Sequence, residues 1–268
     1  MIDTHSHIDE PEFTDDLPAV VERARQAGVQ KIFVPAICRA ELPHLIATCR
    51  QYPGYLYPMI GLHPENIMDE DYHSVLHDFE LQLQQSVSDP SAPQFIAVGE
   101  VGLDLYWDDT HLDEQLEVFE QQIVWAEHYQ LPLMIHCRKA HEHLMQLMER
   151  HRNSNLTGIF HCFTGTADEA RQLLSFPGFC LGIGGVLTFK KSALPAALQE
   201  AAVPISRIVL ETDSPYMAPT PHRGNRNESA YVVEVANRLA QLYDMTVEEI
   251  DRITTENALR IFRKVQKD

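Results

Sequence analysis

The sequence predicts an α/β protein with the fold of a (β/α)8 TIM barrel, formed by a single domain over residues 1–268. Three observations support this prediction. Short apolar runs and longer amphipathic stretches alternate along the chain, and there are eight such runs. The length of 268 residues is close to the roughly 250 residues of a typical barrel. No Ser- or Gly-rich linker and no abrupt change of composition divides the chain.

The eight apolar runs are the predicted strands. Many of them are nearly continuous in apolar residues, which is typical of parallel strands that helices cover. They comprise residues 1–5, 31–35, 55–61, 95–99, 131–136, 158–161, 179–184 and 207–212. The alternative is a doubly wound open sheet. Such a sheet usually has a Gly-rich phosphate turn after its first strand, and the sequence contains no G-x-G-x-x-G pattern.

The stretches between and after these runs have apolar residues at helical spacing. Those between the strands include residues 16–27, 41–52, 112–129, 140–151 and 167–175, and two more, 229–243 and 246–265, close the chain. Residues 82–94, rich in Gln, Ser, Asp and Pro, are predicted to be a helix end followed by a surface loop. Strands that alternate with helices in this way indicate a parallel sheet closed into a barrel.

The charge balance narrows the classes of function. The chain has 39 acidic and 21 basic residues, and its formal net charge is −18. A surface of that sign repels polyanions at long range, which argues against a protein that wraps duplex DNA. It leaves open a small metal-loaded site that acts on one phosphate at a time, because bound metal ions dominate the local field.

The cysteines and the N-terminus predict a soluble, cytoplasmic protein. The five cysteines are odd in number and include no C-x2-C pair, which argues against a disulfide framework and a zinc knuckle. The N-terminus lacks a basic segment followed by an apolar stretch, and the longest uncharged apolar-rich run, residues 179–189, is too short to span a bilayer. We expect no membrane association and a monomer, and the sequence indicates no protein partner.

Residues able to bind metals or transfer protons gather at the ends of the predicted strands. They are His5, His7, His63, Glu100, His136, His161 and Asp213. In a barrel the carboxyl ends of all strands open onto one face, where the active site is built. These residues, scattered along most of the chain, are therefore expected to converge in one bowl.

The types of these residues suit a metal site. Imidazole and carboxylate ligands together suit zinc, manganese, iron or nickel. His5 and His7 are two apart on a strand, so both side chains point to the same face and can reach one ion. Glu100 can bridge two ions about 3.5–4 Å apart. Each residue alone has an ordinary structural explanation; Asp213, for example, can cap a turn. If all of them had only such structural roles, however, their shared positions and chemical types would be several separate coincidences.

Six blocks that carry these residues resemble those of the TatD family of metal-dependent hydrolases and deoxyribonucleases, within the amidohydrolase superfamily. The blocks are DTHSHID at 3–9, GLHP at 61–64, GEVGLD at 99–104, PLMIHCR at 132–138, FHCF at 160–163 and ETDSP at 211–215. They occur in the family's order and extend over nearly the whole chain, which makes the set highly specific.

The resemblance implies a barrel of the metallo-dependent hydrolase type with two divalent ions, such as zinc, manganese or magnesium. It assigns His5, His7, Glu100 and Asp213 to one ion, and Glu100, His136 and His161 to the other. It also makes Glu100 and Asp213 catalytic, with Asp213 as the base for the attacking water. Superfamily members with a carbamylated lysine place it on the fourth strand, where this chain has Glu100.

The resemblance implies phosphodiester hydrolysis, with nucleic acid as the substrate of a 3′–5′ exonuclease. Substrate contacts are expected from His63, which can also cap a helix, and from Arg138 and Arg223, which can bind phosphate. Tyr106, Trp107 and Phe163 lie just past strand ends and can stack on a base or sugar, although packing in the core or at the rim is the ordinary explanation for each of them. Two alternatives stay open: hydrolysis of an ester, amide or lactone by the same metals, and a non-catalytic binding protein on the same barrel.

Overall fold

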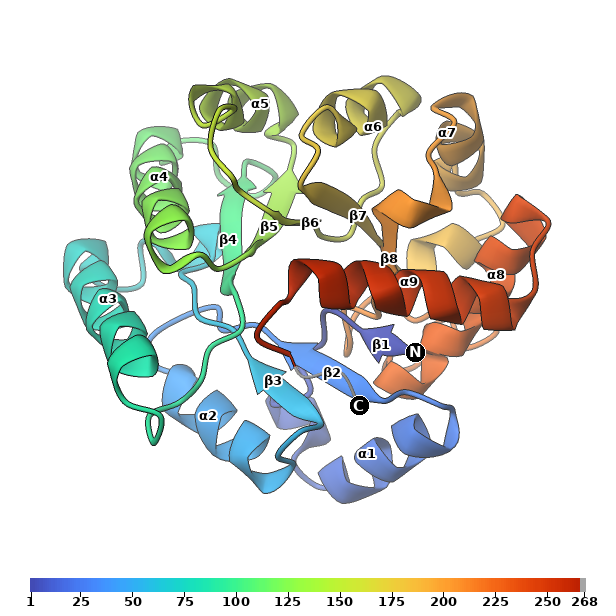
Figure 1. Cartoon of the computed structure of the whole chain (residues 1–268), viewed down its shortest axis with the longest axis horizontal. Helices are drawn as coiled ribbons and strands as arrows, with labels where there is room; N and C mark the ends of the chain where they lie inside the picture. Colours follow the sequence, from blue (N-terminus) through green and yellow to red (C-terminus); the bar gives the residue numbers. More distant parts are fainter. Residues whose placement is uncertain (266–268) are drawn as a thin grey trace.

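The computed structural model describes residues 1–265, in which eight β-strands surround a common axis and helices lie outside them (Figure 1). The strands are β1 (Ile2–Asp3), β2 (Lys31–Val34), β3 (Leu56–Pro58), β4 (Val98–Asp104), β5 (Leu133–Arg138), β6 (Gly158–Phe160), β7 (Phe179–Ile183) and β8 (Ile208–Leu210). Each predicted strand therefore contains or overlaps an observed one.

The strands form two parallel sheets that close into a barrel. One sheet has the order β1-β2-β3 and the other the order β4-β5-β6-β7-β8. Two isolated parallel bridges join them, Ile60 with Val98 on one side and Ser6 with Ser214 on the other. The predicted (β/α)8 barrel is therefore confirmed.

The helices cover the outside of the barrel and, in one case, its end. They are α1 (Leu17–Gln26), α2 (Leu42–Gln51), α3 (Tyr72–Ser88), α4 (Leu112–Tyr129), α5 (His141–Arg150), α6 (Ala167–Leu174), α7 (Leu194–Glu200), α8 (Val232–Tyr243) and α9 (Val247–Ile261). Each helical stretch predicted from periodicity contains one of these helices. The helix end and loop predicted at residues 82–94 are also confirmed, because α3 ends at Ser88.

Local sequence explains where two of these helices begin. At the start of α6, the Thr166 hydroxyl accepts a hydrogen bond from the Glu169 N–H, and the Glu169 carboxylate accepts one from the Thr166 N–H. Thr246 and Glu249 form the same capping box at the start of α9. Such boxes satisfy backbone donors that the first turn of a helix leaves unpaired.

The last helix seals the amino-terminal end of the barrel. Side chains from several strands, among them Ile2, Phe33, Met134 and Val209, form a buried cluster inside the barrel. Phe262, directly after α9, is fully buried in the same cluster, and Figure 1 shows α9 in red across the front of the barrel. Apolar side chains fill this end of the barrel. The functional side chains are therefore expected at the opposite, carboxyl-terminal end, where barrel enzymes have their active sites.

The fourth strand differs from its prediction. The sequence predicts this strand at residues 95–99, whereas β4 begins at Val98 and continues past Glu100. Its pairing with β5 shifts between Val98 and Val101. The Glu100 N–H donates instead to the Ala36 carbonyl oxygen, at 2.9 Å. The irregularity frees Glu100 from the ladder with β5, and such a change depends on the neighbouring strand rather than on local periodicity.

All five cysteines are free thiols, in keeping with a fold whose large apolar core needs no disulfide. Within residues 1–265, no helix has both the length and the apolar character needed to cross a membrane.

Candidate metal centre

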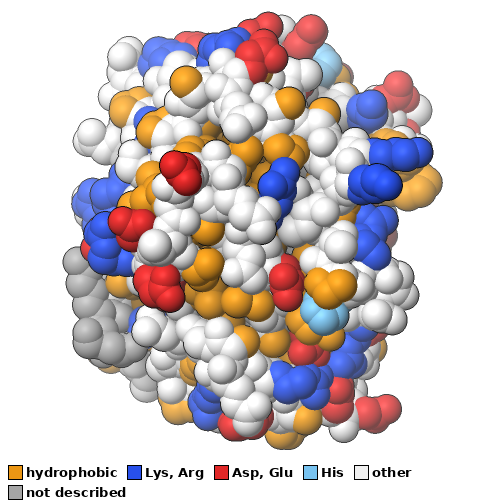
Figure 2. All heavy atoms as spheres, turned by 90° about the vertical axis from the view of Figure 1, so that its right-hand side faces the viewer, with side chains coloured by type: hydrophobic (Ala, Val, Ile, Leu, Met, Phe, Trp, Pro, Cys, Tyr) orange, Lys and Arg blue, Asp and Glu red, His pale blue; other side chains and the backbone are white. Residues whose placement is uncertain are grey.

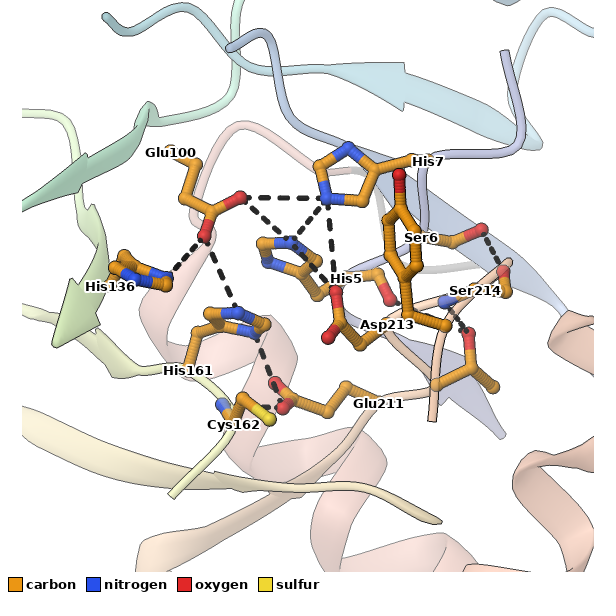
Figure 3. Close-up of polar contacts among 12 residues, drawn as sticks. His5, Ser6, His7, Glu100, His136, His161, Cys162, Glu211, Asp213 and Ser214 are labelled. Atoms are coloured by element: carbon orange, nitrogen blue, oxygen red, sulfur yellow. Dashed lines mark hydrogen bonds and ion pairs between the residues drawn. The ribbon is translucent and has the colours of Figure 1, made fainter. Parts of the chain in front are cut away.

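The six candidate metal ligands meet at the carboxyl-terminal end of the barrel, as Figure 3 shows. A cavity of about 400 Å³ opens there. Five of the six line it, namely His7, Glu100, His136, His161 and Asp213. His5 is fully buried, and its ring stacks on that of His161 with the ring centres 3.7 Å apart. The barrel thus brings together residues that its topology predicted to converge.

A first group of ligand atoms surrounds one oxygen of Glu100. The Nε2 atoms of His5 and His7 lie 3.2 Å and 3.5 Å from Glu100 Oε2. Both nitrogens also lie 3.8 Å from Asp213 Oδ1 and 3.1 Å from each other. Two imidazole nitrogens and two carboxylate oxygens therefore share one small volume, as the ligands of a single cation do.

A second group surrounds the other oxygen of Glu100. Glu100 Oε1 lies 3.0 Å from His136 Nδ1 and 3.4 Å from His161 Nε2. It also lies 3.4 Å from His63 Nε2. Ligand atoms of His63, Glu100 and His136 are all within 4.8 Å of one another. Glu100 thus presents one oxygen to each group, which is the arrangement of a carboxylate that bridges two ions.

Two carboxylates contact the far sides of the imidazoles in the second group. Asp104 Oδ2 lies 2.8 Å from His136 Nε2, and Glu211 Oε1 lies 3.3 Å from His161 Nδ1. Carboxylates in this position fix the orientation of metal-binding histidines and raise their basicity. With Nε2 of His136 directed at Asp104, the Nδ1 atom of the same ring faces Glu100 and the cavity.

Glu211 is a residue of the site that sequence reasoning did not single out. It is fully buried, and its Oε1 accepts a hydrogen bond from the Cys162 N–H at 2.6 Å. Gly182 leaves room for it, because a Cβ there would lie 2.1 Å from the Glu211 carboxylate. The sequence offered one indication, because Glu211 belongs to the same ETDSP block as Asp213, at the end of the predicted eighth strand.

A buried hydrogen-bond network joins the two segments that carry His5 and Asp213. The Asp3 carboxylate accepts hydrogen bonds from the Thr212 N–H at 2.9 Å and from the Thr212 hydroxyl at 2.7 Å. Burial raises the pKa of Asp3 to about 7, although hydrogen bonds from Thr212 and Ser229 oppose the rise. This network ties the end of β1 to the end of β8, on which the first ligand group depends.

The two carboxylates that line the cavity floor differ in acidity. Burial opposes ionisation of Glu100, but the imidazoles of His5, His63 and His161 outweigh it and hold the pKa of Glu100 well below its usual value. Burial raises the pKa of Asp213 to about 6 against the opposing effect of neighbouring imidazoles. Glu100 is therefore the stronger acid of the two, and Asp213 is the better proton acceptor, which suits a candidate general base.

The residues present fit divalent cations. The donors are imidazole nitrogens and carboxylate oxygens, the set that zinc, manganese and related ions accept. Among residues 1–265, no lysine or arginine is paired with the buried carboxylate of Glu100 or with that of Asp213. Buried carboxylates without a cationic partner are costly unless a positive charge compensates them. Bound divalent ions would supply that charge.

His63 caps a turn and also lines the cavity. It directly precedes the 3-10 turn Pro64–Asn66, and its Nδ1 accepts a hydrogen bond from the Glu65 N–H at 3.2 Å. The neutral ring therefore carries its proton on Nε2, beside Glu100. Burial lowers the pKa of His63, although the Glu100 charge opposes this effect. Because His63 caps the turn through Nδ1, its protonated Nε2 is a neutral hydrogen-bond donor at the cavity wall.

The two arginines predicted to bind substrate lie in different places. Arg138 lines the metal cavity, and its guanidinium carbon lies 3.6 Å from the ring centre of Tyr106 and 5.7 Å from that of Trp107. Trp107 also lines the cavity and is 75% exposed. Arg223 lies outside this cavity in a separate pocket, where its guanidinium carbon is 3.5 Å from the ring centre of Phe189.

Known proteins resemble this chain along its whole length. The family model described as TatD related DNase matches residues 2–263. The chain is 37% identical over 263 residues to the uncharacterized metal-dependent hydrolase YabD of Bacillus subtilis, covering 98% of this chain and 99% of YabD. It is 30% identical over 268 residues to the 3′-5′ ssDNA/RNA exonuclease TatD of Edwardsiella piscicida, covering 98% of this chain and 99% of that protein.

A solved structure agrees with these matches. The crystal structure of YjjV, a TatD homologue from Escherichia coli K12, superimposes with a TM-score of 0.87 and 31% sequence identity, covering 98% of each chain. Sequence and structure thus agree over nearly all of the barrel, including the segments that carry the candidate ligands. The chain therefore belongs to the TatD family of metal-dependent hydrolases.

Proposed function

We propose that this protein is a divalent-metal-dependent phosphodiesterase that removes nucleotides from the 3′ end of single-stranded nucleic acid. The observation that carries the proposal is the placement of Glu100, whose two oxygens face two separate groups of imidazoles on the floor of an open cavity. Two-ion centres bridged in this way are typical of phosphatases and nucleases. The relative from E. piscicida, which shares the whole barrel, is named a 3′-5′ ssDNA/RNA exonuclease.

In this proposal the candidate ligands hold two divalent ions, of zinc, manganese or magnesium. His5, His7, Glu100 and Asp213 would hold one ion, and Glu100, His136 and His161 the other. When bound, such ions lower the pKa of a water toward about 7 and polarise the phosphoryl group. The carboxylates of Asp104 and Glu211 keep the imidazoles of the second group in position.

Asp213 and His63 act on the reacting atoms. Asp213 lines the cavity and has a pKa raised by burial to about 6, so it is largely ionised at neutral pH and can accept the proton of the attacking water. His63 presents its Nε2 proton at the cavity wall, where it can donate to a non-bridging phosphate oxygen. A donor placed there stabilises negative charge that develops in the transition state.

The size and the rim of the cavity favour one strand end over a duplex. A cavity of about 400 Å³ lies in the range of sites for a single small ligand. Arg138 at its edge can pair with a phosphate. The exposed ring of Trp107 beside it can stack on a base. These contacts suit the terminal nucleotide of a single strand.

A substrate panel tests this proposal. The metal-loaded protein is offered bis(p-nitrophenyl) phosphate alongside a carboxylic ester, an amide and a lactone. We expect metal-dependent hydrolysis of the phosphodiester. Arg138→Ala should lower kcat/KM for the phosphodiester by about 10- to 100-fold, because a hydrogen bond to a charged group contributes roughly 1.5–3 kcal/mol.

The matched control is Arg171→Ala, which removes an exposed arginine that pairs with Asp168 on α6, outside the cavity. It should leave the rate unchanged. Turnover of the ester, amide or lactone with no turnover of the phosphodiester would keep the metal centre and reject the proposed substrate class.

A further inference from the structure

A pocket lined by three cationic side chains, here called the basic pocket, lies outside the metal cavity. Its volume is about 500 Å³, and it lies between the loop after β7 and the loop after β8. The residues that matter in its wall are Phe189, Lys190, Lys191, Ser192, Thr220 and Arg223. Three of them are cationic, two carry hydroxyl groups, and no acidic side chain among residues 1–265 lines the pocket. In a chain with a net charge of −18, such a composition is unusual.

The cations of this pocket are not neutralised by acidic side chains. Among residues 1–265, neither Lys190 nor Lys191 makes an ion pair, whereas arginines elsewhere on the surface, such as Arg39 and Arg171, do. Arg223 packs on Phe189, and its guanidinium makes no hydrogen bond within the described part of the chain. Three cations without anions create a local positive potential inside a negative field, and an anionic ligand would relieve their repulsion.

The basic pocket is held next to the metal cavity. Met217 lines the metal cavity and Thr220 lines the basic pocket; three residues of extended chain span at most about 11 Å. The loops pack directly, because a Cβ on Gly185 would lie 2.0 Å from the Met217 carbonyl oxygen. The Thr220 N–H also donates to the Thr188 hydroxyl at 2.8 Å.

The surface around this region is consistent with such a site. Figure 2 views the side of the molecule that is on the right in Figure 1, and lysine and arginine side chains gather toward its right-hand edge. The front of the view in Figure 1, where α9 seals the barrel, is turned to the left in Figure 2, so the right-hand edge of Figure 2 belongs to the opposite end of the barrel. The basic side chains therefore gather toward the end of the barrel at which the metal cavity opens.

We infer that the basic pocket binds a backbone phosphate of single-stranded nucleic acid on the 5′ side of the bond that is hydrolysed. This inference rests on the proposed nuclease function. An enzyme that removes the 3′-terminal nucleotide leaves the rest of the strand on the 5′ side of its reaction centre, so the strand must leave the metal cavity across the rim. Lysines, an arginine and hydroxyl groups are the side chains that bind such phosphates. Long substrates would reach both sites, and a small diester only the metal centre.

The test compares two double variants that change the net charge equally. Lys190→Ala/Lys191→Ala removes two cations from the pocket, and Arg252→Ala/Arg263→Ala removes two on and after α9, at the sealed end of the barrel. Binding of a fluorescein-labelled, phosphorothioate-linked single strand to the manganese-loaded protein is followed by anisotropy at several salt concentrations. Hydrolysis of an unmodified strand and of bis(p-nitrophenyl) phosphate is measured in parallel.

We expect the lysine variant to raise Kd and KM for the strand about tenfold at low salt and to hydrolyse the small diester like the unaltered protein. The slope of log Kd against log salt should fall by about 0.7, since the pocket holds one backbone phosphate and each phosphate contact to a single strand contributes about 0.7. If the unaltered protein degrades the strand and both double variants behave alike, the phosphate pocket is rejected and the nuclease function stands. If the unaltered protein neither binds nor degrades the strand, both proposals are rejected.

Discussion

At the scale of the residue, Glu100 organises the site. Its side chain is almost fully buried, and its two oxygens contact two different groups of imidazoles. Its type and its meeting with ligands from other strands could be predicted, because all strand ends of a barrel share one face. Its position within the strand could not, since Glu100 lies inside β4 and not at its end. The shift of register that leaves Glu100 unpaired with β5 could not be predicted, since such a shift depends on the partner strand. The contact of Glu211 with His161 could not be predicted either, because it depends on the space that Gly182 leaves for the Glu211 side chain.

Glu211→Gln tests whether carboxylates behind the imidazoles tune the centre. The amide keeps an oxygen that can accept from the Cys162 N–H but removes the charge facing His161. We expect the affinity for zinc or manganese to fall about 10- to 100-fold, as is typical when such a carboxylate is lost. Isothermal titration of the chelator-treated protein measures this. Glu65→Gln, on the cavity wall, is the control; equal affinities in the two variants would rule out the assigned role.

At the scale of the element, α9 separates the two ends of the barrel. The periodicity of the closing stretch predicts a helix at residues 246–265, and α9 occupies residues 247–261. The capping box at Thr246 and Glu249 explains why its start could be predicted so closely. Its position across the amino-terminal end could not be predicted, because an apolar stripe shows that a helix packs but not against which surface.

Phe262→Ala tests this seal. Phe262 is fully buried in the cluster inside the barrel, so its truncation should lower the free energy of unfolding by about 3–5 kcal/mol. The metal centre lies at the other end, and the folded fraction should keep its activity. Urea denaturation gives the stability. Glu256→Ala, an exposed position on α9, should change it by no more than about 0.5 kcal/mol. Similar values for both variants would show that the helix does not seal the core.

At the scale of the whole molecule, an acidic protein contains a cavity lined by candidate metal ligands and a separate pocket lined by three cationic side chains. Eight alternating strand and helix units sufficed to predict the barrel and the face on which its functional residues meet. The basic pocket was not predicted, although Arg223 was expected to contact substrate. Its lysines and Arg223 come from different loops, and the packing of Gly185 against Met217 that brings these loops together is a tertiary contact.

Metal removal should destabilise the whole fold. The buried carboxylates of Glu100 and Asp213 lack lysine or arginine partners in the described structure, so an ion that binds only the folded state stabilises it. At a metal concentration 100 times the Kd, the gain is about 2.7 kcal/mol, or roughly 5–11 °C in Tm for a protein near this size. Calorimetry with chelator and then with manganese measures the shift. A rise of the same size in Asp213→Asn would place the stabilising ion elsewhere.

We propose that the ligands around Glu100 support metal-dependent hydrolysis of a single strand from its 3′ end. The most direct measurement follows release of a 3′ label from a single-stranded oligonucleotide, with chelator-treated protein alone and after addition of zinc, manganese or magnesium. Asp213→Asn is run in parallel, with circular dichroism to confirm its fold. We predict release of the label only with added metal, and none from the variant. Full activity of Asp213→Asn, or release in the presence of excess chelator, would contradict this account.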